Sequence, residues 1–514
     1  MRRSLFVLFF LAACSHSPGP FARSVLMEEA PLPAEMNTES YARLDDNPFL
    51  DATQNPLSTF SIDVDTASYS NVRRMLAAGV RPPKDAVRIE ELVNYFPYRY
   101  PTPEADSPFA VHAETLPCPW SPTHRLVKLG LKGRELTVTT RPAANLVFLL
   151  DVSGSMSDLN KLPLLKRALQ LLVTQLREDD RVAIVVYAGA SGLALPSTSG
   201  ANKQRILDAL NELGAGGSTN GAAGIQLAYQ TAEENFLVGG INRVILATDG
   251  DFNVGTASEG ALTRLVEEKA KSGVALTVLG LGMGNYKDSM LEKLADKGNG
   301  NYAYLDTLQE ARKVLVEQAS GTLVTIAKDV KLQVEFNPAH VQAYRLIGYE
   351  NRLLRSEDFN NDKKDAGELG AGHTVTAMYE VVPVHPERSR GSERDEVPAV
   401  DALRYQPSVH PERSRGSEGE GSDELMTVKL RYKHPEGETS RVLSFPVVDG
   451  ARPASPDARF AAAVAEFGLL LRDSPHKGHA SWGEVLELAT ASAGEDPYRR
   501  EFLELVKQAA ALHD

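Results

Sequence analysis

The chain has 514 residues, of which 42% are hydrophobic and 24% charged, and its formal net charge is −13. This length exceeds what one hydrophobic core serves and predicts two to four domains of a soluble, globular type. The acidic excess argues against nucleic-acid binding as the main activity, because phosphate contacts require a basic surface.

The first residues have the pattern of an export signal. Arg2 and Arg3 precede the apolar run Leu5–Leu11, which is too short to span a bilayer. The run continues into Ala-Ala-Cys14, which resembles the lipobox of bacterial lipoproteins. The resemblance implies a signal peptide over residues 1–14, cleavage before Cys14 and acylation of that cysteine. Position 15 is Ser and not Asp, which in that family favours the outer membrane; a plain secretory leader is the alternative.

The cysteine count agrees with lipidation. The chain has two cysteines, so acylation of Cys14 leaves only Cys118, and an internal disulfide is excluded. We expect Cys118 to be a packed thiol without a catalytic role.

The segment after the signal changes from tether to folded protein. Residues 15–45 are rich in Pro, Ala, Ser and Glu and predict a flexible tether, and residues 46–108 predict an N-terminal helical region. Within it, Asp63-Val-Asp65-Thr66 is similar to the D-x-D-x-T nucleophile motif of haloacid-dehalogenase-type phosphatases, although Thr66 comes one place early. We favour a structural role in which Asp65 or Thr66 caps the next helix. The alternative is a metal-dependent phosphate-ester hydrolase that uses Asp63 and Asp65.

Residues 109–142 and 321–450 alternate apolar and polar side chains, which predicts antiparallel strands. We expect the two segments to pair as a β-sandwich into which residues 143–320 are inserted. The unit at 384–393 recurs unchanged at 409–418 and has almost no apolar content, so a disordered insertion near 384–422 is expected. A basic or phosphorylatable motif is the alternative. Residues 451–514 have helical periodicity and predict a C-terminal helical region.

Residues 143–320 alternate strand and helix patterns, which predicts an α/β fold with a doubly wound, mainly parallel sheet. Further strands are expected at 182–187, 244–247, 274–279 and 302–305, and helices at 162–176, 203–213, after 219, at 261–271, around 291 and at 308–318. Gly280-Leu-Gly-Met-Gly284 superficially has the form of a dinucleotide-binding turn, but its third glycine is displaced. We interpret it as a tight turn between strand and helix.

Polar side chains follow two of the predicted buried strands. The apolar run Leu146–Leu150 is followed directly by the pattern D-x-S-x-S, and the run Arg243–Thr248 is followed directly by an aspartate. The loop Gly214–Gly221, which lies between these runs in the sequence, carries a threonine. The side chains concerned are Asp151, Ser153, Ser155, Thr219 and Asp249. Ligands of open α/β sheets bind at the carboxyl ends of the strands, and hard oxygen donors suit Mg²⁺.

This arrangement resembles the metal-ion-dependent adhesion site of von Willebrand factor type A domains. The resemblance implies that Ser153, Ser155 and Thr219 contact the metal, while Asp151 and Asp249 hold it largely through water. It also implies a protein partner whose Asp or Glu carboxylate fills the open coordination position. Mg²⁺ is expected, and Mn²⁺ or Ca²⁺ could replace it.

The lipobox, the segment STFSIDVDTASYSNVRR, the adhesion-site pattern and the helical tail together resemble the bacterial YfbK-type von Willebrand A lipoproteins over nearly the whole mature chain. The duplicated HPERSRGSE unit departs from that family. We therefore predict a non-enzymatic, envelope-tethered protein that binds a partner through Mg²⁺. The hydrolase described above and a scaffold with a vestigial metal site are the alternatives.

Overall fold

The computed structural model describes most of the chain after residue 38. The described residues are 39–62, 64–104, 107–136, 140–188, 191–217, 221–250, 259–284, 286–384, 403–405, 423–435, 437–449 and 453–513. Cys14, Asp63, Thr219 and the repeated units, apart from Val384, lie outside these residues. Every helix in the described ranges is too short or too polar to cross a lipid bilayer.

Six strands form a mainly parallel sheet in the order β10-β9-β8-β5-β6-β7. Their bounds are β5 (Ala144–Asp151), β6 (Arg181–Tyr187), β7 (Ser191–Ser199), β8 (Ile241–Thr248), β9 (Ala275–Gly280) and β10 (Tyr302–Tyr304). Neighbours pair in parallel except β7, which runs antiparallel to β6 at the edge. The predicted fold class, a doubly wound and mainly parallel sheet, is confirmed. The sequence did not reveal β7, because its residues are mostly small or polar and include a proline, which an edge strand tolerates.

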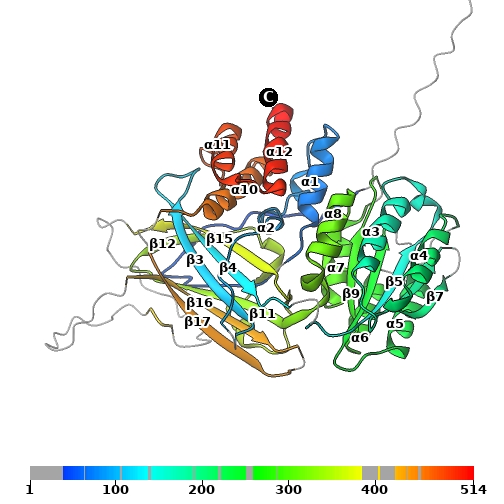
Figure 1. Cartoon of the computed structure of the whole chain (residues 1–514). Coiled ribbons are helices and arrows are strands. Elements are labelled where there is room, and N and C mark those ends of the chain that lie inside the picture. The colour runs from blue at the N-terminus through cyan, green and yellow to red at the C-terminus, as the bar shows by residue number, and fades with distance from the viewer. Residues whose placement is uncertain are drawn as a thin grey trace, which may run out of the picture. The chain divides into compact units, whose positions relative to one another are not determined.

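Helices cover both faces of this sheet (Figure 1). They are α3 (Leu162–Thr174), α4 (Lys203–Glu212), α5 (Gly221–Glu234), α6 (Glu259–Ala270), α7 (Asp288–Lys297), α8 (Leu308–Arg312), the π-helical turn η4 (Lys313–Glu317) and α9 (Ala319–Leu323). Successive side chains of β5 point to opposite faces. Phe148 shares a hydrophobic cluster with Leu165 of α3, whereas Leu149 clusters with Ile225 of α5. A strand buried on both faces explains the continuous apolar run in the sequence.

Two antiparallel sheets form the β-sandwich, in the orders β1-β12-β15-β4-β3 and β13-β2-β11-β16-β17, with β14 paired to β11. The strands are β1 (Leu50–Asp51), β2 (Leu57–Ser61), β3 (Phe109–Pro117), β4 (Arg125–Gly133), β11 (Thr325–Phe336), β12 (Val341–Ile347), β13 (Leu353–Leu354), β14 (Gly367–Gly370), β15 (Thr374–Pro383), β16 (Glu424–Lys433) and β17 (Ser440–Val448). Facing side chains such as Leu129 and Leu332 share one hydrophobic cluster.

The sandwich combines strands from before and after the parallel sheet, as the sequence predicts, since β4 pairs with β15. The region 46–108 differs from its prediction as a helical segment, because it also supplies β1 and β2, and β2 pairs with β11. β2 is buried from Ser58 to Ser61, and only Phe60 among these residues is apolar, so its sequence lacks the alternation of apolar and polar residues that marks a strand.

Helices from both ends of the described chain form a third core. They are α1 (Ala67–Ala77), α2 (Ile89–Asn94), α10 (Pro456–Leu471), α11 (Trp482–Ala493) and α12 (Pro497–His513). Phe96, which follows α2, lies edge-on to Phe460 and Phe502 at ring-centroid distances of 4.9 and 5.6 Å. These contacts join the N-terminal and C-terminal helices, which Figure 1 shows side by side. Cys118 is a buried free thiol of the same cluster, as expected.

The cap of α1 is not the one predicted. Thr66 occupies the N-cap position, but its side chain makes no capping hydrogen bond within the described structure. The backbone N–H of Ser68 instead donates to the Glu91 carboxylate at 2.7 Å. Asp65 accepts a hydrogen bond from the Tyr302 N–H at 2.8 Å and so anchors β10 rather than the helix. The helix is capped by a carboxylate from α2, which local sequence does not disclose.

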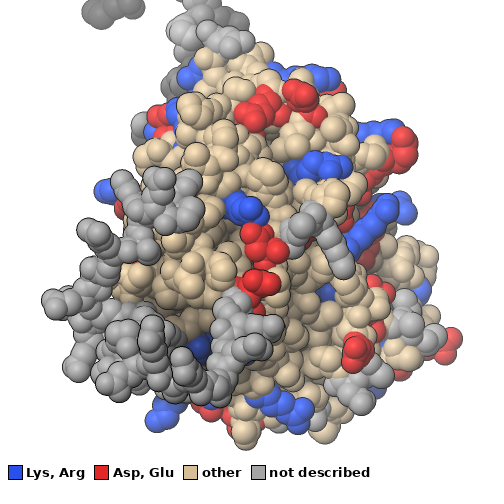
Figure 2. Space-filling model, turned by 90° about the vertical axis from the view of Figure 1, so that its left-hand side faces the viewer, with Lys and Arg blue, Asp and Glu red and all other residues tan. Residues whose placement is uncertain are grey.

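Charged side chains of both signs are interspersed on the face shown in Figure 2. Lys and Arg do not gather there into one basic patch.

Candidate metal centre

The two predicted aspartates lie at the carboxyl edge of neighbouring strands. Asp151 is the last residue of β5, Asp249 directly follows β8, and these strands are paired through Leu150 and Ala247. Both aspartates are buried, with 0% and 2% of their surface exposed. The chain topology therefore brings together two residues that are 98 positions apart in the sequence.

Asp151 is held by three donors. One carboxylate oxygen, Oδ1, accepts the Ser153 N–H at 2.9 Å, and Oδ2 accepts the hydroxyls of Thr248 at 3.2 Å and Tyr187 at 3.3 Å. Burial raises the pKa of Asp151, and the nearby charge of Asp249 also raises it, while the hydrogen bonds from Ser153 and Thr248 act in the opposite direction. Negative charge is thus concentrated away from water, a condition that a bound cation would relieve.

The two serine hydroxyls lie next to these carboxylates. Ser153 Oγ and Ser155 Oγ are 3.0 Å apart and form a hydrogen bond with each other. Ser153 is 2% exposed, whereas Ser155 is open to solvent. The pair therefore runs from the buried side of the site towards its surface.

Thr219 lies outside the described residues, but the loop that leads to it contacts the site. The Gly216 N–H donates to the Val152 carbonyl at 2.7 Å, and the Gly154 N–H donates to the Gly217 carbonyl at 3.1 Å. This loop segment is therefore bonded to the chain between Asp151 and Ser155. Whether Thr219 is a ligand stays a prediction.

Sequence reasoning missed a buried cation at this edge. The Lys161 ammonium donates to Asp249 Oδ2 at 3.0 Å and to the Ser155 carbonyl at 3.0 Å, and only 7% of Lys161 is exposed. Lys161 precedes α3 by one residue. Its distance along the chain from Asp151 matches no motif, so only folding reveals the contact.

The donor set fits Mg²⁺ in kind. Asp151, Ser153, Ser155 and Asp249 supply hard oxygen atoms, and a solvent-facing hydroxyl leaves room for water or a ligand. The described structure contains no group of three or more His, Cys, Asp and Glu side chains able to hold a metal. A metal at this edge would accordingly depend on hydroxyl ligands, which the serine pair provides.

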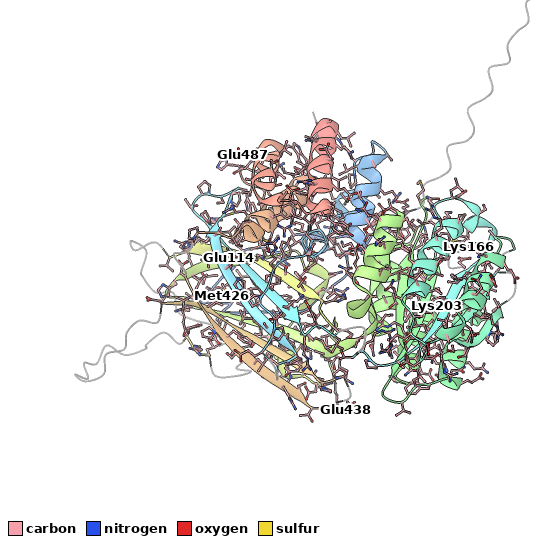
Figure 3. The ribbon with its side chains drawn as sticks, viewed as in Figure 1. Glu114, Lys166, Lys203, Met426, Glu438 and Glu487 are labelled. Carbon is pink, nitrogen blue, oxygen red and sulfur yellow. The ribbon has the colours of Figure 1, made fainter. Side chains whose placement is uncertain are left out.

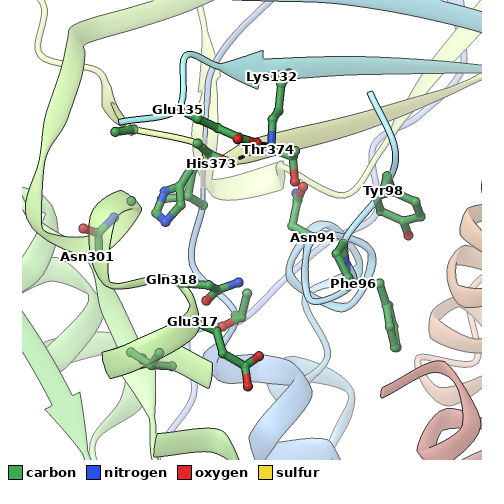
Figure 4. Close-up of a pocket in the computed structure, with 18 of the residues that line it drawn as sticks. Asn94, Phe96, Tyr98, Lys132, Glu135, Asn301, Glu317, Gln318, His373 and Thr374 are labelled. Carbon is green, nitrogen blue, oxygen red and sulfur yellow. Dashed lines mark hydrogen bonds and ion pairs between the residues drawn. The ribbon is translucent and has the colours of Figure 1, made fainter. Parts of the chain in front are cut away.

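A cavity of about 400 Å³ lies at the opposite end of the parallel sheet, against the sandwich (Figure 4). Its lining includes Tyr302, the first residue of β10, with Lys132 and His373. Lys132 is paired with Glu135 at 2.8 Å, and burial lowers the pKa of His373 to about 4, so the imidazole is neutral at pH 7. This cavity supports a functional site less well than the carboxyl edge.

Asp65, a candidate of the hydrolase hypothesis, also lies away from Asp151. Its carboxylate accepts the N–H of Tyr302 and lies 3.6 Å from Arg352. Tyr302 opens β10, whereas Asp151 closes β5, so the two aspartates lie at opposite ends of a parallel sheet. No observation at Asp65 supports a nucleophile that shares a metal with Asp151.

Three family models match successive parts of the chain. The model described as "von Willebrand factor" matches residues 35–128, "von Willebrand factor type A domain" matches 145–318, and "Uncharacterized protein YfbK, C-terminal" matches 321–512. The match to the von Willebrand factor type A domain covers the parallel sheet and the candidate metal centre.

Solved structures similar to this chain include a von Willebrand factor type A protein from Catenulispora acidiphila, with 17% identity, a TM-score of 0.41 and coverage of 76% of this chain and 89% of that one. They also include the conserved hypothetical protein BatB from Bacteroides thetaiotaomicron, with 22% identity, a TM-score of 0.30 and coverage of 35% and 98%. At these TM-scores, neither structure says what this chain binds.

Two curated proteins are more informative. Inter-alpha-trypsin inhibitor heavy chain H4 from Homo sapiens is 30% identical over 172 residues, which are 32% of this chain and 18% of that protein. The protein YfbK from Escherichia coli (strain K12) is 45% identical over 490 residues, which are 94% of this chain and 83% of that protein. Because this second match spans most of both sequences, the chain belongs to the YfbK family and carries a von Willebrand factor type A domain.

Proposed function

We propose that this protein is an envelope-tethered module that binds a protein partner through a divalent metal ion. In this proposal Ser153, Ser155 and Thr219 contact Mg²⁺, and Asp151 and Asp249 hold it largely through water. A carboxylate from an Asp or Glu of the partner completes the coordination shell. Mn²⁺ or Ca²⁺ could take the place of Mg²⁺.

One observation carries the proposal: the paired strands β5 and β8 place two buried carboxylates beside two serine hydroxyls. Buried carboxylates without enough positive charge are costly, so a cation is the natural occupant. The hydroxyls are neutral, so they bind a metal without exhausting its positive charge. An acidic group from a second molecule is then attracted to it.

The surroundings of the site suit a protein partner. Leu159 is 87% exposed and Met283 is 53% exposed, and both lie within two residues of the contact between Lys161 and Gly282. On the other flank, a groove of about 490 Å³ runs between α3 and the end of α4, next to Ser155. Its lining combines the partly exposed, apolar Leu213 with basic side chains, including Lys166, which is labelled in Figure 3. Apolar and basic surface beside a metal favours a partner segment with acidic and apolar residues.

Capture of a partner from envelope extract tests the binding proposal. The wild-type chain, without its signal peptide, should retain a partner in Mg²⁺ and release it in EDTA, and Asp151→Ala should retain none. Asp179→Ala is the matched control, because Asp179 is an exposed aspartate of the same domain, with 59% of its side chain accessible. Capture that is equal with and without EDTA would favour the vestigial-site scaffold and contradict the metal-dependent function.

The tether is tested separately. Cells that express the full chain should incorporate an alkyne-labelled fatty acid into it, and Cys14→Ser should abolish the label. When the membranes are fractionated, the wild-type protein should be found in the outer-membrane fraction. A labelled Cys14→Ser variant would show that lipid attaches elsewhere and would contradict the lipobox interpretation.

A further inference from the structure

Lys161 places a positive charge inside the proposed metal centre. Its ammonium is 3.0 Å from Asp249 Oδ2 and 3.0 Å from the carbonyl oxygen of Ser155. Asp158 is a third neighbour at 3.6 Å, but 67% of its side chain is exposed, so water screens its charge. Lys161 therefore compensates mainly the buried Asp249.

The path of the Lys161 side chain is restricted. Its backbone N–H donates to the Asp158 carbonyl at 3.0 Å, and its carbonyl accepts the Leu165 N–H in the first turn of α3. Gly282 packs against the aliphatic stem: a Cβ at position 282 would lie 2.4 Å from Lys161 Cε. Gly282 also has a φ of +75°, which favours glycine. The fold thus keeps space for this lysine beside Asp249.

The charges of the buried groups determine what the site attracts. Among the described residues of the site, Asp151 and Asp249 carry two negative charges and Lys161 carries one positive charge, so these three groups have one negative charge in excess without a metal. A divalent cation changes this balance to one positive charge in excess. Without Lys161, the same cation would only neutralise the two aspartates. The lysine therefore lowers the attraction for the metal and raises the attraction for an anion once metal is bound.

We infer that Lys161 is a positioning residue with two opposed effects: it weakens Mg²⁺ binding by pairing with Asp249, and it gives the loaded site the positive charge that selects an acidic partner group. The inference deepens the proposed function and rests on it. It assigns partner selection to the protein's own charge as well as to the metal.

Calorimetric titration of the mature chain with Mg²⁺ tests the first effect. Lys161→Met and Lys161→Gln should bind Mg²⁺ about tenfold more tightly than the wild type, and Lys161→Arg should not. Lys161→Gln keeps an N–H donor for the Ser155 carbonyl, which preserves folding if the methionine variant fails. Lys203→Met is the matched control, because it removes the same charge from the same domain, and the Lys203 ammonium donates to the Thr174 carbonyl at 2.8 Å. Its Mg²⁺ affinity should change less than twofold.

Water-proton relaxation of bound Mn²⁺ tests the second effect, with acetate as the probe. The acetate concentration that displaces metal-bound water should be several-fold lower for the wild type than for Lys161→Gln. Equal Mg²⁺ affinities in the wild type and both neutral variants, or equal acetate responses, would overturn the inference and leave the proposed function intact. Absence of Mg²⁺ binding in the wild type and in all variants would instead overturn the proposed function. Binding only by the neutral variants would show that Lys161 excludes the metal from the wild type, which would overturn both the proposed function and the second effect.

Discussion

Two regions of the molecule pair their carboxylates with different kinds of cation. Around α1, α2, α7 and β10, three arginines pair with carboxylates from several elements, and we name this set the arginine junction: Arg73, Arg88 and Arg352 with Asp65, Glu91, Asp288, Glu292, Asp296, Asp306, Glu310 and Glu501. At the carboxyl edge of the parallel sheet, Asp249 pairs with one lysine, Lys161, whereas Asp151 accepts hydrogen bonds from Ser153, Thr248 and Tyr187.

Each arginine of the arginine junction contacts more than one carboxylate. Arg88 contacts Asp288 at 2.6 Å and also pairs with Glu91, which in turn accepts the Ser68 N–H at the start of α1. Asp288 additionally accepts the Tyr302 hydroxyl at 2.9 Å. A planar guanidinium with five donors fixes several acceptors at once, so these carboxylates are committed to joining α1, α2, α7 and β10.

The metal centre is held more loosely. Lys161 offers one compact ammonium, and Ser153 and Ser155 bond to each other. A small cation can replace an ammonium or join it without dismantling a network of side chains. The comparison teaches that the number of buried carboxylates does not decide whether a cation could be accommodated, because the kind of donor around the carboxylates also matters.

The largest expected effect breaks the arginine junction. Arg88→Ala should lower the free energy of unfolding by about 3–5 kcal/mol, because it leaves Glu91 and Asp288 buried without their guanidinium. Urea denaturation followed by circular dichroism measures this loss. Arg167→Ala, at an exposed position of α3, should change stability by less than about 0.5 kcal/mol. If Arg88→Ala and Arg167→Ala lowered the free energy of unfolding by similar amounts, the arginine junction would not be a main source of the protein's stability.

Glu466 extends the comparison to a carboxylate that pairs with no cation among the described residues. It is 0% exposed, accepts the Ser481 N–H at 3.2 Å, and burial followed by repulsion from Glu484 raises its pKa to about 8. The folded state therefore binds a proton that the unfolded chain releases near pH 4.5, so stability should fall as pH rises from about 4.5 to about 8.

Glu466→Gln should remove this pH dependence. The variant should be more stable than the wild type by roughly 2–4 kcal/mol at pH 8 and nearly equal to it at pH 5. Thermal unfolding at the two pH values measures the difference. A difference in stability between the wild type and Glu466→Gln that is the same at both pH values would contradict the raised pKa of Glu466.

Two glycines of one turn sharpen the role of Lys161. Gly282 and Gly284 have φ values of +75° and +88°, so alanine at either position should cost roughly 1–2 kcal/mol in backbone strain. Only at Gly282 would the new Cβ collide with Lys161, whereas nothing lies within 4 Å at Gly284. Gly282→Ala should therefore be the less stable variant and, by displacing the ammonium, should bind Mg²⁺ more tightly than Gly284→Ala. Equal Mg²⁺ affinities would show that the stem contact does not hold the lysine at Asp249.

The smallest expected effect is stabilisation by the metal itself. Mg²⁺ at ten times its dissociation constant should add about 1.4 kcal/mol to the free energy of unfolding. Differential scanning calorimetry should show a higher Tm that EDTA reverses. Asp249→Asn should lose this shift, whereas Asp179→Asn, at an exposed position, should keep it. A shift that persists in Asp249→Asn would place the stabilising ion elsewhere.

Much of the fold could be predicted because its signals are local. The run Leu146–Leu150 is apolar throughout, since β5 is buried on both faces, and the helices around the sheet carry regular apolar stripes. The edge strand β7 and the short β2 lacked such signals. Their place depends on hydrogen bonds to partners far along the chain.

In the candidate site, too, some residues could be placed from the sequence and others could not. The sequence placed Asp151, Ser153, Ser155 and Asp249 after apolar strands, which is a matter of local spacing. It did not place Lys161 against Asp249, and it assigned the α1 cap to Asp65 or Thr66 when Glu91 provides it. Long side chains such as Lys and Glu reach several ångströms, so their partners follow from packing and not from spacing.

By itself the sequence determined the alternation of strand and helix, the oxygen-rich strand ends and membership of a family, because each depends on residue type and order. Only the tertiary structure decided which carboxylates are committed to arginines and that Asp249 is paired with a lysine. The physical reason is that electrostatic pairing falls with distance and strengthens with burial, and both quantities exist only after the chain has folded.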